Sequence, residues 1–297
     1  MTIDVDTPAT PVLPAAAGQR PVARSPLRRL GAAARQPILV LSWIIVLVVL
    51  GWAVAPQLFT AHGPYDGNTA ASFLPPGTEH WFGTDRLGRD LFARSVYGAR
   101  TTLTATLLAV LIAFGIGTVV GLVSGFVGGI VDTVIMRLVD VFLAIPSLLL
   151  AMVVVSVLGY STNNIALAVG ISAIASFARV MRAEVLVVVH QDYVRAAYGV
   201  GVRRLGVMLR HVVPNSLGSV VALAALEVGS AVLAVAALGF LGYGAPPPQP
   251  EWGLLVAEGR DYVAVYPWAS IMPGAALAIV VVATHRISTS LRKDRRR

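Results

Sequence analysis

The sequence predicts an all-α, polytopic membrane protein with six transmembrane helices. Of its 297 residues, 56% are hydrophobic and only 13% are charged, whereas charged residues make up about a quarter of an average soluble domain. Apolar runs recur along the chain at about the 20 residues that cross a bilayer core. Arginines cluster at the ends of these runs, which predicts that both termini lie in the cytoplasm. The net charge of +8 follows from this arrangement and does not indicate nucleic-acid binding.

The first hundred residues divide into a tail, a first span and an external segment. Residues 1–36 begin with a Pro-, Ala- and Thr-rich stretch without periodicity, which predicts a disordered cytoplasmic tail. Residues 37–59 are apolar and predict the first transmembrane helix. Residues 60–100 are polar with mixed charges and are predicted to lie outside, ending in an amphipathic lead-in helix from Asp90. The side chains expected on its membrane side are Leu91, Val96 and Ala99.

Residues 101–290 are predicted to hold five further spans. The first of these carries Gly115, Gly117, Gly121 and Gly125, a spacing that lets a neighbouring helix approach closely. Pro146 predicts a kink in the next span, and Gly229 is a candidate bend in a later span that exceeds one bilayer crossing. The expected spans are 102–127, one that ends near 157, 165–181, 212–243 and 267–284. Residues 291–297 are a basic tail, predicted to be cytoplasmic.

The most basic interior segment lies between two long apolar runs, from Gln191 to Pro214: QDYVRAAYGVGVRRLGVMLRHVVP. It predicts short helices over 193–197 and 202–209, broken by Gly199 and Gly201, with Pro214 opening the next long helix. A charged, amphipathic elbow of this kind, residues 190–211, is suited to docking on another protein at the cytoplasmic surface. The alternative is an ordinary basic loop that its charge holds inside. The arginines of the segment are Arg195, Arg203, Arg204 and Arg210.

Two segments predicted to be external carry distinctive patterns. They are HWFGTDRLGRDLFARSVYGART at 80–101 and GYGAPPPQPEWGLLVAEGRDY at 242–262. The first begins as a Gly-rich turn and continues as the lead-in helix. We interpret it as a structural brace for the bundle, with contact to a transported substrate as the alternative. The motif residues in these segments are Gly83, Thr84, Asp85, Gly88, Arg89, Asp90, Trp252 and Gly253.

The basic elbow resembles the loop that holds an ATPase in ABC importer permeases. In that family, Glu-Ala-Ala, three residues, Gly, nine residues and Ile-x-Leu-Pro form the socket helix. The residues at the matching spacing are Ala196, Ala197, Gly201 and Pro214. Arg195 replaces the usual Glu, and His211 and Val213 replace Ile and Leu. The form D-Y-V-R-A-A…R-H-V-x-P-N is similar to the dipeptide/oligopeptide/nickel branch, and both external segments resemble its C-type permease subunit. The resemblance covers roughly residues 78–293.

This resemblance implies a type I importer permease in the bacterial inner membrane, which forms half of the path for di- or oligopeptides. Implied partners are a homologous second permease, two ABC ATPase subunits that hold ATP and Mg, an external substrate-binding protein and membrane lipid. The alternatives are a nickel or haem permease on the same scaffold and, in another class, a channel or scaffold that works without nucleotide. The implied ATPase contacts are Asp192, Tyr193, Arg195, Ala196, Ala197, Gly201, Arg210 and Pro214.

The sequence contains no pattern typical of an enzyme. It has no G-x-x-x-x-G-K-[ST] loop, and its single lysine, Lys293, lies in the tail, so we expect no nucleotide site of that kind in this chain. No histidine pair stands at metal-ligand spacing, and no cysteine is present. We therefore expect no catalytic residue, cofactor or metal in this subunit. The histidines, predicted to be interfacial polar groups, are His62, His80, His190, His211 and His285.

Glu227 is an ionisable residue well inside an apolar run. A carboxylate there is costly and usually faces a cavity or a partner. One interpretation is a wall residue of the substrate path, near a peptide amino group. The other is a carboxyl group that is protonated or hydrogen-bonded to the neighbouring subunit. In either case the sequence predicts that Glu227 faces the interface with the second permease and not lipid.

Overall fold

The computed structural model describes residues 37–295, so the tail predicted at residues 1–36 lies outside the described part of the chain. The described chain is helical, and its only strand-like pairings are two isolated β-bridges. The main helices are α2 (Pro37–Val54), α3 (Leu91–Val127), α4 (Gly129–Ala144), α5 (Ser147–Leu158), α6 (Thr162–Val189), α7 (Asp192–Gly199), α8 (Arg204–Val207), α9 (Val213–Leu238), α10 (Trp252–Arg260) and α11 (Trp268–Arg295). The basic tail expected from residue 291 continues α11 to Arg295.

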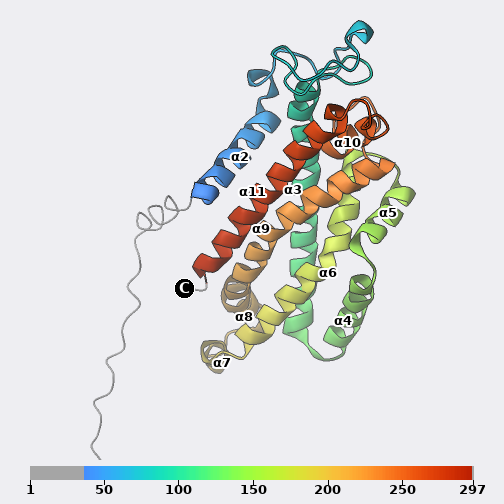
Figure 1. Cartoon of the computed structure of the whole chain (residues 1–297). Coiled ribbons are helices and arrows are strands. Elements are labelled where there is room, and N and C mark those ends of the chain that lie inside the picture. Colours follow the sequence, from blue (N-terminus) through green and yellow to red (C-terminus); the bar gives the residue numbers. More distant parts are fainter. Residues whose placement is uncertain (1–36, 296–297) are drawn as a thin grey trace, which may run out of the picture.

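Five helical stretches are long and apolar enough to cross a membrane, and the bent pair α4–α5 raises the number to six within residues 37–295. The five are α2, α3, α6, the stretch Arg204–Tyr243 that contains α9, and α11. They form an elongated bundle in which residues 55–90 and α10 lie at one end and α7 and α8 at the other (Figure 1). The prediction of an all-α polytopic membrane protein is therefore confirmed.

The centre of the bundle is the packing of α3 against α6, the most extensive helix pair of the structure. Three of the four glycines singled out in α3 face α6. A Cβ at Gly117 would lie 2.5 Å from the Cβ of Phe177, and a Cβ at Gly125 would lie 2.9 Å from Val185. A Cβ at Gly121 would meet the carbonyl of Ala178, whereas Gly115 faces open space. Small residues let two helix backbones approach closely, which is how membrane helices gain packing contacts.

The helix α3 corrects the prediction of a separate lead-in helix. It is continuous from Leu91 to Val127, so the amphipathic stretch and the second span are one helix of 37 residues. The side chains of Leu91, Val96 and Ala99 were expected on the membrane side, but they are buried inside the protein. The reason is that residues 60–90 and α10 pack around this end of α3 and cover it.

The third predicted span is broken at Pro146. The axes of α4 and α5 meet at 94° across this break, much more than a simple kink. Proline restricts the residue before it to extended backbone, and Ile145 accordingly has φ −88° and ψ 129°. Ion pairs hold α4 against α6: Arg182 donates to both carboxylate oxygens of Asp132 at 2.6 Å, and Arg179 contacts Asp140 at 2.5 Å.

The stretch that contains α9 ends at Tyr243 as predicted, but its start differs from the prediction. The helix begins at Arg204 and passes through a π-helical turn, Met208–Val212, into α9. Pro214 therefore lies in the first turn of α9, as predicted, but the helix runs into this turn from Arg204 and does not begin there. No break occurs at Gly229, where α9 stays helical and passes close to Thr284 of α11. A second π-helical turn, Gly239–Tyr243, ends the stretch.

Candidate functional sites

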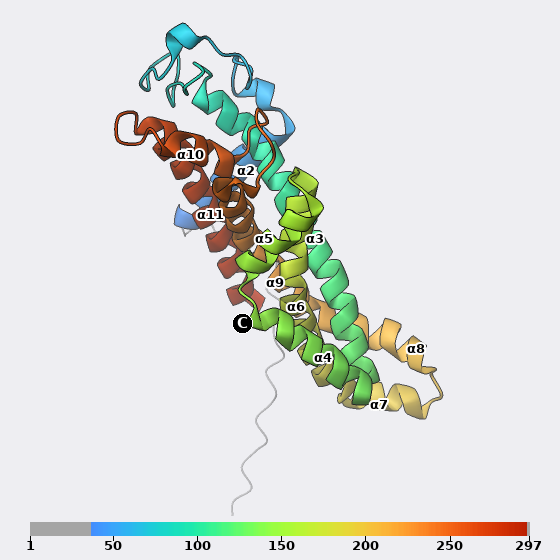
Figure 2. The ribbon, with the colours of Figure 1, turned by 90° about the vertical axis from the view of Figure 1, so that its right-hand side faces the viewer.

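The elbow forms a helical hairpin that projects from one end of the bundle (Figure 2). Its first arm, α7, is amphipathic, because Val194 and Ala197 are buried in a cluster with Val188 of α6 and with Val207 and Val212 of the returning arm. These contacts join the hairpin to the spans on either side of it. A force applied to α7 would therefore be felt by α6 and α9.

The opposite face of α7 is exposed. Asp192, Tyr193, Arg195 and Ala196, all predicted contact residues, lie on this surface, while Ala197 lies on the buried face. The four arginines of the elbow are exposed too, and none forms a salt bridge within residues 37–295. Exposed Val200 and Leu205 add apolar surface. A surface that combines free charge with apolar and aromatic groups has the composition of a protein contact.

Gly201 makes the turn of the elbow. Its φ of 82° lies in the left-handed region, where residues with a Cβ are strained. Two backbone hydrogen bonds close the turn: Gly201 N donates to Tyr198 O at 3.0 Å, and Val202 N donates to Ala197 O at 3.1 Å. Gly199, also predicted to break the helix, is instead the last residue of α7. The turn therefore depends on one glycine, and Arg210 and Pro214 follow it on exposed positions of the returning helix.

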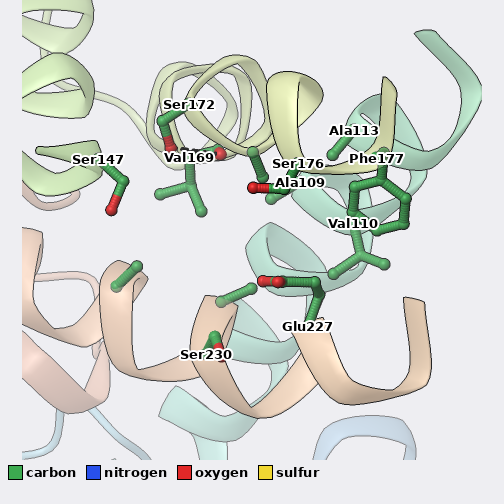
Figure 3. A pocket seen from close by; sticks show the side chains of 13 residues that line it. Ala109, Val110, Ala113, Ser147, Val169, Ser172, Ser176, Phe177, Glu227 and Ser230 are labelled. Atoms are coloured by element: carbon green, nitrogen blue, oxygen red, sulfur yellow. Dashed lines mark hydrogen bonds between the residues drawn. The ribbon is translucent and has the colours of Figure 1, made fainter. Parts of the chain in front are cut away.

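A pocket of about 290 Å³ lies among the transmembrane helices. Glu227 is its one ionisable lining residue, and its carboxylate points into the space from α9 (Figure 3). The side chain is partly exposed, with no hydrogen bond or salt bridge to any residue of the described chain. The pocket is lined by Ala109, Val110 and Ala113 of α3, Ser147 of α5, Val169, Ser172, Ala173, Ser176 and Phe177 of α6, and Glu227, Ser230, Ala231 and Ala234 of α9.

The serines of this pocket were not predicted from the sequence. Ser172 and Ser176 are four residues apart on α6, and Glu227 and Ser230 are three apart on α9, so each pair shares one helix face. Figure 3 shows the two faces opposite each other across the pocket. The spacing within each helix could have predicted that the two residues of each pair share a face. The packing of α6 beside α9 could not be predicted from the sequence in this way, because it depends on tertiary contacts.

The opposite end of the bundle carries a buried ion cluster. The carboxylate of Asp85 accepts hydrogen bonds from Arg89 Nε at 2.6 Å and Arg94 Nη1 at 2.8 Å, and the same Arg94 nitrogen lies 2.5 Å from Glu258 of α10. Arg94 is fully buried, so its charge depends on these two carboxylates. The cluster ties the segment before α3, α3 itself and α10 together. Arg94 and Glu258 were missing from the predicted motif residues.

The other motif residues shape the same region. Thr84 donates to Ala71 O at 2.6 Å and accepts from Leu74 N at 2.7 Å, and Asp90 caps α3 by accepting from Ala93 N at 2.5 Å. Gly83 and Gly88 have φ of 75° and 70°, which residues with a Cβ rarely adopt. These contacts are internal to the protein, and they agree with our interpretation of the segment as a brace.

The α10 helix is fastened to α3 by its first residues. Trp252 is fully buried and its indole donates to Ser95 O at 2.8 Å. Gly253 lies against the carbonyl of Ala236 with no room for a Cβ. Glu251 caps α10 by accepting from Gly253 N at 2.8 Å and Leu254 N at 2.9 Å. Burial raises the pKa of Glu251 to about 7, against the lowering effect of these backbone hydrogen bonds and of Thr102.

Comparison with known proteins places the chain in a family. Residues 117–297 match the family described as "Binding-protein-dependent transport system inner membrane component". The dipeptide transport system permease protein DppC of Alkalihalophilus pseudofirmus is 36% identical over 258 residues, which is 87% of this chain and 85% of the relative. The probable D,D-dipeptide transport system permease protein DdpC of Escherichia coli K12 is 40% identical over 249 residues, 84% of this chain and 83% of the relative.

Two further comparisons agree with the family match and the two dipeptide permease relatives. The glutathione transport system permease protein GsiD of Shigella flexneri is 37% identical over 265 residues, covering 89% of this chain and 86% of the relative. A solved structure, the crystal structure of an amino acid ABC transporter with histidines, matches with a TM-score of 0.53 at 16% identity, over 68% of this chain and 94% of that one, and so supports the fold alone. This chain therefore belongs to the binding-protein-dependent transport permeases, the non-catalytic inner-membrane subunits of ABC importers, which work with an ATPase and a binding protein.

Proposed function

We propose that this chain is one of two homologous permease subunits of an ATP-driven importer for di- or oligopeptides, with two ATPase subunits bound at the elbow end. The main observation that supports this proposal is the structure of the elbow. It is the one part of the described chain that presents a folded, amphipathic hairpin with four unpaired arginines, and it is joined through its buried face to α6 and α9. Closure of the ATPases would move α7, and the buried contacts would pass that movement to the spans that line the pocket.

The orientation follows from the distribution of charge. Arginines gather at the elbow and at the C-terminal end of α11, which favours the cytoplasm for this end of the bundle and for both termini. The opposite end, with residues 60–90 and α10, would then face the external binding protein. An elbow on the cytoplasmic side is required if it is to meet an ATPase.

A peptide substrate is supported by the relatives and by the pocket. Two of the relatives are named for dipeptides and one for glutathione. The pocket offers one carboxylate and four serine hydroxyls in an otherwise apolar lining, groups that suit the ammonium and amide groups of a peptide. It contains no His, Cys or Met side chain, the groups typical of a nickel path, so we favour peptides over nickel. Glu227 would be a wall residue of the path, at the interface with the second permease.

Copurification tests the subunit composition. The full-length chain would be purified from membranes in mild detergent, and the mass of the intact complex and the identity of its subunits would be determined by mass spectrometry. We expect this chain, a homologous permease and two ATPase subunits in one complex. The matched variant Arg195→Glu reverses one exposed charge of α7 and should lower the yield of ATPase but not that of the second permease. A wild-type chain that purifies alone, with no nucleotide-binding subunit, would contradict the proposal.

A further inference from the structure

Two histidines and a carboxylate meet near the outer end of α3. His62 lies in the loop after α2, His80 in the segment before α3, and Asp90 at the N-terminus of α3. Each residue has one ligand atom that lies within 4.8 Å of those of the other two. His80 Nδ1 is 2.7 Å from Asp90 Oδ2, and the ring centroids of His62 and His80 are 5.2 Å apart. The two histidines are remote in sequence, so no local spacing signalled the cluster.

The backbone holds two of these residues in place. Asp90 is 4% exposed, and its Oδ1 accepts from Ala93 N, which leaves Oδ2 directed at His80. The carbonyl of His80 accepts from Gly77 N and Gly83 N, both at 2.9 Å. His62 is exposed, so the cluster opens on its side to solvent. A buried carboxylate, a partly buried imidazole and an accessible second imidazole form a site that an ion can enter.

We propose that His62, His80 and Asp90 bind a divalent transition metal ion, with Zn²⁺ the best fit. Imidazole nitrogen and carboxylate oxygen are the ligands of three-residue zinc sites, at about 2.0–2.2 Å from the ion, with the fourth position left to water. The ligand atoms lie within 4.8 Å of one another, and side-chain rotation of His62 and His80 would bring them to those distances from one ion. Ions such as Ca²⁺ and Mg²⁺ prefer sites made of oxygen alone.

The ion would fasten the external segment to the transmembrane bundle. Residues 60–90 contact α3 through Asp85 and Asp90, but His62 itself forms no side-chain hydrogen bond within the described chain. A bound ion would join the His62 loop directly to the cap of the 37-residue helix α3. The site is separate from the pocket and the elbow, so it depends on neither the proposed substrate nor the proposed ATPase contact.

Zinc titration of the purified protein tests the site. The protein would be purified from membranes with its bound subunits on a tag that contains no histidine, stripped with a chelator, and titrated with ZnCl₂ in a calorimeter. We expect saturable binding of about one ion per chain. His62→Gln should weaken it by roughly tenfold or more, whereas His190→Gln, a matched change of an exposed histidine at the start of the elbow, should leave it unchanged.

Thermal unfolding gives an independent readout. Because an ion that binds only the folded state stabilises it, ZnCl₂ should raise the unfolding temperature of the wild type and of His190→Gln, but not that of His62→Gln or His80→Gln. Since His62 is exposed, His62→Gln should unfold at the wild-type temperature without zinc. Absence of saturable zinc binding in the wild type, or equal affinity in His62→Gln, would overturn the proposal.

Discussion

At the scale of single residues, Glu227 is the main candidate for contact with the transported substrate. A charged carboxylate in the middle of a span costs at least ~2.5 kcal/mol on insertion scales, and no residue of the described chain pairs with it. Instead it lines a pocket together with four serines. Because this carboxylate is costly in a span and has no partner in the described chain, we infer that it binds a group from outside the chain.

Replacing Glu227 by Gln should therefore impair transport more than assembly. The amide keeps the size of the side chain and removes its charge, so we expect peptide uptake to fall by about tenfold, the loss of one charge-assisted hydrogen bond. Uptake of labelled peptides by cells and the yield of intact complex would be measured together. Glu79→Gln, the same change at an exposed position of the segment before α3, is the control. Unchanged uptake across several peptides in Glu227→Gln would remove this residue from the substrate path.

Glu251 gives a second prediction at this scale. Its pKa of about 7 in the folded protein lies above its ordinary value of 4.5. Between these values the unfolded chain loses the proton while the folded protein keeps it, so stability should fall as pH rises from 4.5 to 7 and then level off. The total change is about 3 kcal/mol. Thermal unfolding at pH 5 and pH 8 should show this loss in the wild type but not in Glu251→Gln. Equal pH dependence in both proteins would show that another group is responsible.

At the scale of elements, the elbow depends on the conformation of Gly201. Gly199 and Gly201 both face open space, and only Gly201 has a left-handed backbone. Valine at Gly201 should strain or rearrange the turn, at a cost of about 1–3 kcal/mol, and change the direction of α7. We expect Gly201→Val to uncouple ATP hydrolysis from uptake while the complex stays in the membrane.

Gly199→Val is the matched control, since it adds the same side chain outside the left-handed region. It should retain most of the uptake. ATP hydrolysis and peptide uptake would be measured on the same preparations of both variants. Normal uptake per ATP hydrolysed in Gly201→Val would show that the shape of the elbow is not needed for coupling.

The elements that the sequence could predict are those controlled by local pattern. Apolar runs gave the spans, the spacing of Gly117, Gly121 and Gly125 anticipated close packing against a neighbour, and Pro146 marked the break between α4 and α5. The rest depended on tertiary contacts. Leu91 and Val96 are apolar on a helix, and nothing local tells whether lipid or α10 covers them. In the same way, Ser176 and Glu227 share a pocket only because α6 packs against α9.

At the scale of the whole molecule, the two ends are predicted to face opposite compartments. The native chain has no cysteine, so an introduced cysteine is the only thiol of this chain that a labelling reagent can modify. Cysteines at exposed Glu79 and Gln249 should react with an impermeant thiol reagent in intact cells. A cysteine at exposed Gln191, in the elbow, should react only after the membrane is opened. Labelling of Gln191→Cys in intact cells, with protection of the other two, would invert the orientation.

We propose that the assembled importer uses ATP hydrolysed by the partner subunits of this chain to carry peptides inward. The most direct test of this proposal is peptide transport in proteoliposomes that contain the purified complex, with binding protein and labelled di- and oligopeptides on one side and ATP on the other. We expect accumulation of peptide against its gradient that requires ATP and the binding protein and is lost in Gly201→Val. Peptide flux that is equal with and without ATP, or no ATP-dependent accumulation of any peptide, would contradict it.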